Sequence, residues 1–239
     1  NSRADAYSVC VCARPGDYNE GGESFLSLST RLYVSDKRGA PVRVWAVDGP
    51  DKTFITGEVD PESGACGKSA VRCVGIANTN KTVVQGFTLR NGYTANDGTG
   101  GAGSVTYGAG LCNTTTSGSG RSTGYLVDCV VKDCKGGRGT AAYGGNLLRC
   151  RVSNCAVENQ GVFRQSKLYS SLVTGSTGSS CVVSDKSKAY NCTFYGNKQE
   201  VVNGPNTSYS KYGYAYNCVL AGRTSGYDIV TKDYEDDMI

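Results

Sequence analysis

The side chains of this chain that could take part in chemistry are mainly its cysteines. The chain of 239 residues contains 12 cysteines and no histidine. Without imidazole, Ser-His-Asp triads, Cys-His dyads and histidine metal sites are all excluded. A zinc site would need four thiolates, yet no CxxC pair occurs, and Cys10 and Cys12 form a lone CxC. We therefore expect no metal site and no catalysis that depends on histidine.

The carboxylates do not form the pairs that cleavage of a glycosidic bond requires. Inverting hydrolysis uses two carboxyl groups roughly 6.5–9.5 Å apart. Asp128 and Asp133 are followed one repeat later by Arg149 and Asn154, so no ladder of carboxylates develops. Elimination by a lyase would need an Arg or Lys base, commonly with Ca²⁺ held by Asp or Glu. We predict no catalytic residues, no cofactor, and Ca²⁺ only if the chain is a lyase.

Charged and aromatic side chains at outward positions are the candidates for ligand binding. A basic strip along one side would suit an anionic polysaccharide, whereas the ordinary alternative is charge that only solubilises the surface. Exposed tyrosines can stack on sugar rings or bury a protein–protein contact. The candidate ligand-binding residues are Lys132, Arg149, Arg151, Arg164, Tyr195, Tyr209 and Tyr212.

The elements that would position these side chains come from an internal repeat. The repeated positions, 21 residues apart, are Cys129, Cys150, Ser171 and Cys192, then Cys134, Cys155, Ser176 and Asn197, then Leu126, Leu147, Leu168 and Ala189. Cys218 continues the first column after 26 residues, and Phe87 precedes Cys129 in it by 42. We predict a structural cysteine ladder of Cys129, Cys150, Cys192 and Cys218. Short strands with Gly, Ser and Asn at their corners, repeated at a fixed step, are typical of a parallel β-solenoid.

Alternation along the repeated strand predicts which side chains face the core, because successive side chains point to opposite faces. Three mainly apolar columns, which begin at Val127, Cys129 and Val131, are predicted to point inward. The first column continues through Leu148, Tyr169, Tyr190 and Tyr216, so we expect these tyrosines to stack inside the core. A second apolar run recurs at 140–143, 161–164, 181–184 and 201–204.

Several segments carry a resemblance to a known family. They are "CARPGDYNEGG" (12–22), "VRVWAVDGPDKTFITG" (42–57), "VRCVGIANTNKTVVQGFTLRNGYT" (71–94) and "GAGLCN" (108–113), followed by the repeated "NC" strands. Together they resemble the right-handed parallel β-helix repeat family of the pectate-lyase-like superfamily, in its bacterial secreted or surface form. The resemblance implies an all-β, single-stranded right-handed parallel β-helix, with coils of about 21 residues as in the repeat. It implies no single function, since the family includes lyases, hydrolases, epimerases, tailspikes and adhesins.

The organisation predicted from the sequence is one β-helix with a tail. We place the β-helix at 1–225, with a loop-rich insertion at 93–125 that belongs to one coil with two long loops, and an acidic tail or cap at 226–239. Members of the family usually carry a capping segment before the first coil, and here only a few residues precede it. The segment is therefore expected to be cut from a larger protein or to complete its end by docking on another copy.

The composition narrows the partners. Net charge is +4 with no basic block, so nucleic acid is not expected. The sequence contains no run of 18 apolar residues, so no membrane-spanning helix is expected. We expect an extracellular or cell-surface module with a structural, adhesive or glycan-contacting role, whose partner is an extracellular glycan or a second copy joined end to end or laterally. The alternative is a polysaccharide lyase or glycoside hydrolase acting on an anionic polysaccharide.

The ladder cysteines are expected to be buried free thiols, with a disulfide between neighbours such as Cys129 and Cys150 as the alternative.

Overall fold

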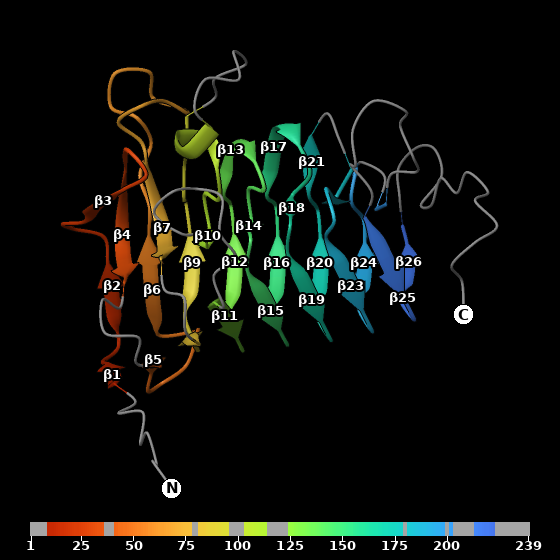
Figure 1. Cartoon of the computed structure of the whole chain (residues 1–239), viewed down its shortest axis with the longest axis horizontal. Coiled ribbons are helices and arrows are strands. Elements are labelled where there is room, and N and C mark those ends of the chain that lie inside the picture. The colour runs from red at the N-terminus through yellow and green to blue at the C-terminus, as the bar shows by residue number, and fades with distance from the viewer. Residues whose placement is uncertain are drawn as a thin grey trace, which may run out of the picture.

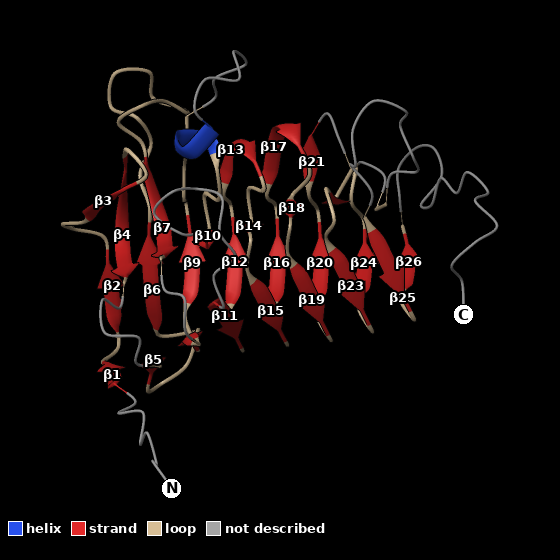
Figure 2. Cartoon of the chain, in the orientation of Figure 1, coloured by secondary structure: helices blue, strands red, loops and turns tan. Residues whose placement is uncertain are grey.

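The chain winds into a parallel β-helix (Figure 1). The computed structural model describes residues 9–35, 41–77, 81–95, 103–113, 124–178, 181–198, 201–202 and 213–222. Within these ranges nearly all regular structure is β-strand, and the one helix described is the short 3-10 turn η1 (Gly103–Thr106), which is too short to cross a membrane (Figure 2). The predicted all-β parallel solenoid is confirmed.

Three long sheets form the walls of the helix. Sheet 1 contains, in spatial order, β1 (Val9–Ala13), β5 (Val42–Ala46), β8 (Thr82–Gln85), β11 (Gly124–Val127), β15 (Asn146–Leu148), β19 (Lys167–Tyr169), β23 (Lys188–Tyr190) and β25 (Tyr214–Tyr216). Sheet 2 contains β2 (Gly16–Tyr18), β6 (Thr53–Thr56), β9 (Thr88–Arg90), β12 (Val130–Lys132), β16 (Arg151–Ser153), β20 (Leu172–Thr174), β24 (Thr193–Tyr195) and β26 (Val219–Ala221). Each coil therefore gives one strand to each of these two sheets.

In the regular coils the third wall, sheet 3, is built from the second apolar runs at 140–143, 161–164 and 181–184. It contains β22 (Val183–Ser184), β18 (Phe163–Arg164), β14 (Ala142–Tyr143), β10 (Leu111–Asn113), β7 (Val71–Ile76), β4 (Leu28–Val34) and β3 (Glu23–Phe25). A smaller sheet 4 joins β13 (Lys135–Arg138), β17 (Ala156–Gln160) and β21 (Thr177–Gly178). All pairs of described strands are parallel except the hairpin of β3 with β4.

The register of the strands matches the repeat that the sequence predicts. Leu126 pairs with Leu147, Leu147 with Leu168, and Leu168 with Ala189. The same step of 21 residues separates the Cys150 N–H from the Ser171 hydroxyl to which it donates a hydrogen bond. Val84 pairs directly with Leu126, so the strands before and after residues 93–125 are neighbours in sheet 1. Much of that insertion, and the predicted tail at 226–239, lies outside the described residues.

The corner between sheets 1 and 2 is set by a residue in the left-handed backbone region. Asp128, Arg149, Ser170, Asn191 and Asn217 occupy this corner in successive coils, with φ between 47° and 52°. Asn and Asp adopt this conformation at lower cost than other side chains. The corner residue bends the chain so that the cysteine after it points into the core.

This corner makes one prediction about the core wrong. The column of Tyr169, Tyr190 and Tyr216 points outward, and the buried column is instead Leu126, Leu147, Leu168 and Ala189, each 0% exposed. Alternation fails at the corner because the corner residue has a left-handed backbone conformation, so the strict inward–outward order of side chains is interrupted there. Two residues, the outward one and the corner residue, therefore lie between one buried position and the next. The tyrosines still stack, but on the surface: the ring centroids of Tyr169 and Tyr190 are 5.2 Å apart, and those of Tyr190 and Tyr216 are 5.0 Å apart.

Candidate functional site

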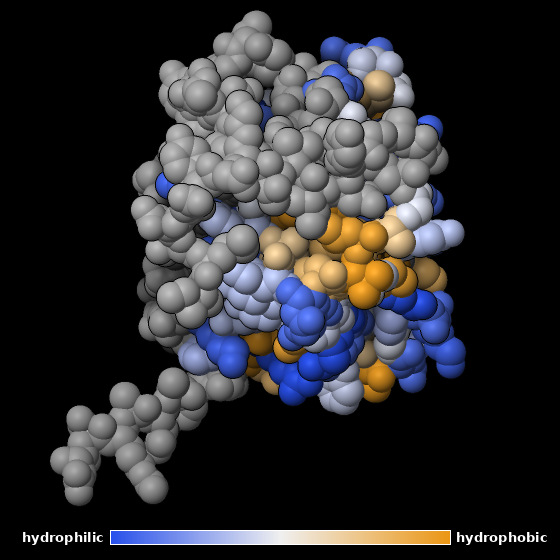
Figure 3. Space-filling model, turned by 90° about the vertical axis from the view of Figure 1, so that its right-hand side faces the viewer, coloured by the Kyte–Doolittle hydropathy of each residue, from blue (hydrophilic) through white to orange (hydrophobic). Residues whose placement is uncertain are grey.

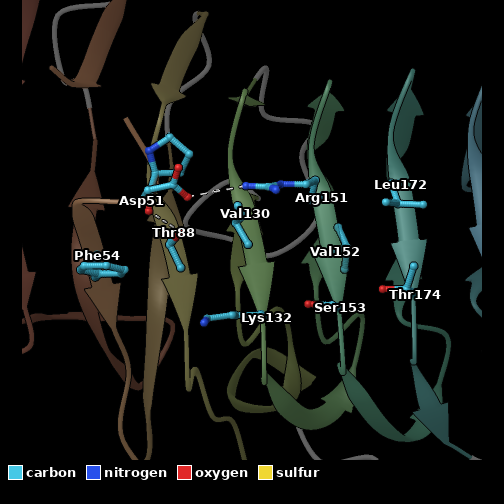
Figure 4. A pocket seen from close by; sticks show the side chains of 11 residues that line it. Asp51, Phe54, Thr88, Val130, Lys132, Arg151, Val152, Ser153, Leu172 and Thr174 are labelled. Atoms are coloured by element: carbon cyan, nitrogen blue, oxygen red, sulfur yellow. Dashed lines mark hydrogen bonds and ion pairs between the residues drawn. The ribbon is translucent and has the colours of Figure 1, made fainter. Parts of the chain in front are cut away.

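A groove of about 360 Å³ lies on the outer face of sheet 2 (Figure 4). Register places its side chains in two rows along the helix axis. One row runs through Phe54, Thr88, Val130, Arg151 and Leu172, and the other through Lys132, Ser153 and Thr174. Arg90, outside the groove, is in register with Lys132 on the neighbouring strand. Residues in a row come from neighbouring strands about 4.8 Å apart, so the two rows form an extended surface across several coils. Such a surface suits an elongated ligand.

A tight loop between β5 and β6 overhangs one end of the groove. Gly49 has a φ of 79°, a conformation that favours glycine, and its carbonyl accepts a hydrogen bond from the Lys52 N–H at 3.3 Å. The Thr88 hydroxyl donates to the Pro50 carbonyl at 2.7 Å and ties the loop to β9. The loop thereby places Asp51 at the rim, where its Oδ1 is 3.8 Å from Nη2 of Arg151 (Figure 4).

A second polar network holds the aromatic end of the groove. The Arg90 guanidinium lies over the Phe54 ring, 4.4 Å from its centroid. Its Nη2 donates to Asp17 at 2.7 Å, and its Nε donates to the Thr56 hydroxyl at 2.9 Å. Because Arg90 is both ion-paired and stacked, its charge is already neutralised by Asp17, and its guanidinium holds the ring of Phe54 in place.

Lys132 and Arg151 supply the cationic character of the groove. Within the described residues Lys132 makes no ion pair, and the ion pair of Arg151 with Asp51 is exposed, with side chains 62% and 88% accessible. An exposed pair of this kind is weak and easily exchanged for another anion. The hydroxyls of Ser153 and Thr174 lie beside these charges, and Val130 and Leu172 give an apolar floor. The groove can therefore pair with carboxylates, hydrogen-bond hydroxyls and pack against the apolar faces of a ring.

The other two predicted basic residues lie elsewhere. Arg149 is at the corner of sheets 1 and 2, where its Nε and Nη2 donate to the two carboxylate oxygens of Asp128 at 2.7 and 2.9 Å. These hydrogen bonds hold the pKa of Asp128 below its ordinary value. Arg164 is on β18 of sheet 3, paired with Asp185, and its side chain is only 15% exposed. The four residues therefore do not form one continuous strip, although Lys132 and Arg151 do share the groove.

The predicted tyrosines are placed only in part. Tyr195 is 59% exposed and pairs in register with Thr174, so it extends the second row of the groove toward the C-terminal coils. Tyr209 and Tyr212 lie outside the described residues.

Asp51, Phe54 and Arg90 were not predicted from the sequence. They belong to coils of irregular length: Ile55 follows its partner Tyr18 by 37 residues and precedes Leu89 by 34. Their register cannot be read from the regular repeat. The one available signal was the strand–turn–strand pattern of "VRVWAVDGPDKTFITG", which indicates a tight loop beside two strands.

The cysteines of the predicted ladder lie in one column along the core. Cys129, Cys150 and Cys192 are each 1% exposed, whereas Cys218 is half-buried. Burial raises the pKa of Cys129 and of Cys192 to about 11, so both are protonated at neutral pH. Among the described residues no three cysteine or acidic side chains come together as a metal site would require.

Comparison with known proteins finds similarity at the level of solved structures. No protein-family model matches the chain, and no curated protein matches it. A pectin methylesterase in complex with a hexasaccharide aligns with a TM-score of 0.43 and 12% identity, over 96% of this chain and 85% of that one. The pectin methylesterase PemA from Erwinia chrysanthemi aligns with a TM-score of 0.40 and 13% identity, with the same coverage. The A-module of the Azotobacter vinelandii mannuronan C-5 epimerase AlgE4 aligns with a TM-score of 0.21 and 10% identity, over 94% of this chain and 91% of that one.

The sheets themselves establish the fold: strands of successive coils stack in parallel, in register, around one apolar core. The chain is a parallel β-helix.

Proposed function

We propose that this chain is an extracellular glycan-contacting β-helix module that holds a segment of an anionic polysaccharide in the groove of sheet 2. The observation that carries the proposal is the placement of Lys132 and Arg151 on one groove beside the hydroxyls of Ser153 and Thr174. A polysaccharide of uronic acids presents carboxylates, hydroxyls and apolar ring faces along an extended chain, and the two rows offer a partner for each.

The proposal is for binding, with cleavage as the alternative. Asp51 is the single carboxylate among the described residues that line the groove, and it is paired with Arg151. Hydrolysis of a glycosidic bond uses two carboxyl groups in most glycosidases. A polysaccharide lyase would instead use Lys132 or Arg151 as its base, so the assay for binding should also record chain cleavage.

The test is titration of the protein with polygalacturonate, with uncharged dextran as the comparison ligand. Lys132→Ala together with Arg151→Ala should weaken binding of polygalacturonate about tenfold or more, because each removed charge pairs with a carboxylate. Arg149→Gln together with Lys167→Gln removes the same two charges from positions outside the groove and is the matched control, with little expected effect. Equal loss in the control would mean that only net charge attracts the polymer, and the proposal would be wrong.

A second candidate function is self-association at strand β1. Val9 and Val11 pair in register with Val42 and Val44, yet they are 49% and 48% exposed. Exposed valines on a sheet edge favour pairing with another strand. Sedimentation velocity over a wide range of concentrations would test this: assembly should increase with concentration and be abolished by Val11→Lys, and a monomer at all concentrations would rule it out.

A further inference from the structure

In the cysteine ladder, Cys192 and Cys218 are neighbours, and one of their two thiols is accessible to solvent. Cys192 and Cys218 occupy the same column in adjacent coils, because Tyr190 pairs with Tyr216 and Thr193 pairs with Val219. The backbone N–H of Cys192 donates to Sγ of Cys218 at 3.4 Å. Cys192 is 1% exposed, whereas Cys218 is half-buried. This combination of a buried thiol and an accessible one is absent from the ladder pair Cys129 and Cys150, each 1% exposed.

We propose that Cys192 and Cys218 form a disulfide that staples the last described coil to the coil before it. Adjacent strands of a sheet place in-register Cα atoms about 4.8 Å apart, within the range of about 4.4–6.8 Å that disulfides span. Both side chains point toward the core from the same side of the corner, so their Cβ atoms face the same column. The pair needs no movement of one coil past the other to be bridged.

The pair lies at one end of the described β-helix. Strands β25 and β26 are mostly exposed, and each has a sheet neighbour on one side among the described strands. Apolar side chains are open to view at this end of the molecule (Figure 3). A solenoid gains stability from contacts between neighbouring coils, so a coil with one described neighbour opens most readily. A covalent link at this position resists that opening.

The reaction requires an oxidant, and a small disulfide such as oxidised glutathione is the proposed class. The accessible Cys218 thiol loses its proton, and the thiolate attacks one sulfur of the oxidant, which releases one glutathione thiolate and leaves a mixed disulfide. The thiolate of Cys192 then attacks Sγ of Cys218 and displaces the second glutathione thiolate. Two protein thiols are oxidised, one disulfide is reduced to two thiols, and the two protons pass to the released thiolates.

The experiment uses the full chain with Cys10→Ser, Cys12→Ser and Cys66→Ser, which removes the other cysteines that are not buried. The folded protein is incubated with oxidised glutathione at mildly alkaline pH, alkylated, digested without reductant and analysed by mass spectrometry. The expected product is one cross-linked species that joins the peptides of Cys192 and Cys218, lighter than their sum by two hydrogen atoms. Its unfolding midpoint should rise by roughly 7–14 °C over the reduced protein, as expected for closing a loop of this length.

The matched control is Cys218→Ser in the same background. Ser171 already occupies this column and is 4% exposed, so serine fits there without disrupting the core. This variant should give no cross-link and no change of midpoint on oxidation. A glutathione adduct that persists on Cys218 while Cys192 remains free for alkylation on unfolding would overturn the proposal, as would a Cys218 that does not react or a cross-link between other cysteines.

Discussion

The outward position of the tyrosine stack can be tested by introducing one side chain at two neighbouring residues. Ala189 is 0% exposed and lies in the inward leucine column, while Tyr190 lies next to it in sequence and points outward. Glutamate at Ala189 would bury an unpaired carboxylate among apolar side chains, at a cost of several kcal/mol, with about 1–3 kcal/mol more for the excess volume. This sum approaches the whole stability of a typical domain, about 5–15 kcal/mol.

The same glutamate at Tyr190 costs far less. The change removes two stacked ring contacts, at centroid separations of 5.2 and 5.0 Å. Each is worth about 0.5–1.5 kcal/mol, so the expected loss is about 1–3 kcal/mol. At roughly 2–4 °C per kcal/mol for a chain of this size, Tyr190→Glu should lower the unfolding midpoint by about 2–12 °C and leave a cooperative transition.

The assay is thermal unfolding followed by far-ultraviolet circular dichroism, with the two variants measured beside the native chain. Ala189→Glu is expected to be unfolded or to melt without cooperativity, while Tyr190→Glu melts as a folded protein. If Tyr190→Glu unfolds the chain and Ala189→Glu is tolerated, the tyrosines are in the core and the assigned phase of the strand is wrong.

Two further predictions concern single carboxylates. Asp51→Asn should raise the affinity for polygalacturonate about two- to fivefold, because it releases Arg151 from a weak exposed ion pair and removes a negative charge that repels the polymer's carboxylates. Titration of the variant beside the native chain measures this change in affinity. Unchanged or weaker binding would contradict the role given to Arg151. Asp60 accepts hydrogen bonds from the backbone N–H groups of Ser69, Glu62 and Ser63, which lower its pKa from the ordinary value of 3.8. A carboxyl group whose pKa is lowered on folding stabilises the protein above its unfolded pKa and loses that contribution as the pH falls through its folded pKa. The unfolding midpoint of Asp60→Asn should therefore lie below that of the native chain near neutral pH, and the difference should shrink as the pH falls below about 4; a constant difference over a pH series would show that the charge is not what stabilises the loop.

The sequence by itself determined the architecture of the regular coils. The fixed step shared by the cysteine and leucine columns predicts one turn of a parallel solenoid, because each coil must place equivalent side chains against the same core. The inward columns of Cys129 and Val131 follow from alternation alone, since these residues lie within one strand and its flank. The separation of Lys132 from the core follows in the same way.

Tertiary structure decided where alternation breaks and what meets on the surface. The left-handed corner residues reset the phase of the side chains, so the tyrosine column moved from the predicted core to the outer face. A local pattern contains no signal for this, because asparagine and aspartate are tolerated both in bends and on exposed strand positions. The step of 21 residues places Asp128 beside Arg149 and Asp185 beside Arg164, but only the tertiary structure shows that these side chains form ion pairs.

The groove itself depended on the irregular coils. Phe54 and Thr88 enter it from coils whose lengths differ from the regular step, and Asp51 enters from the loop between β5 and β6. Contacts between such segments depend on how their strands pair across the sheet. Because the loops between these strands vary in length, the repeat does not predict that pairing. The repeat thus predicts the sheet on which the groove lies. Which side chains meet in the groove depends on how coils of unequal length stack on one another.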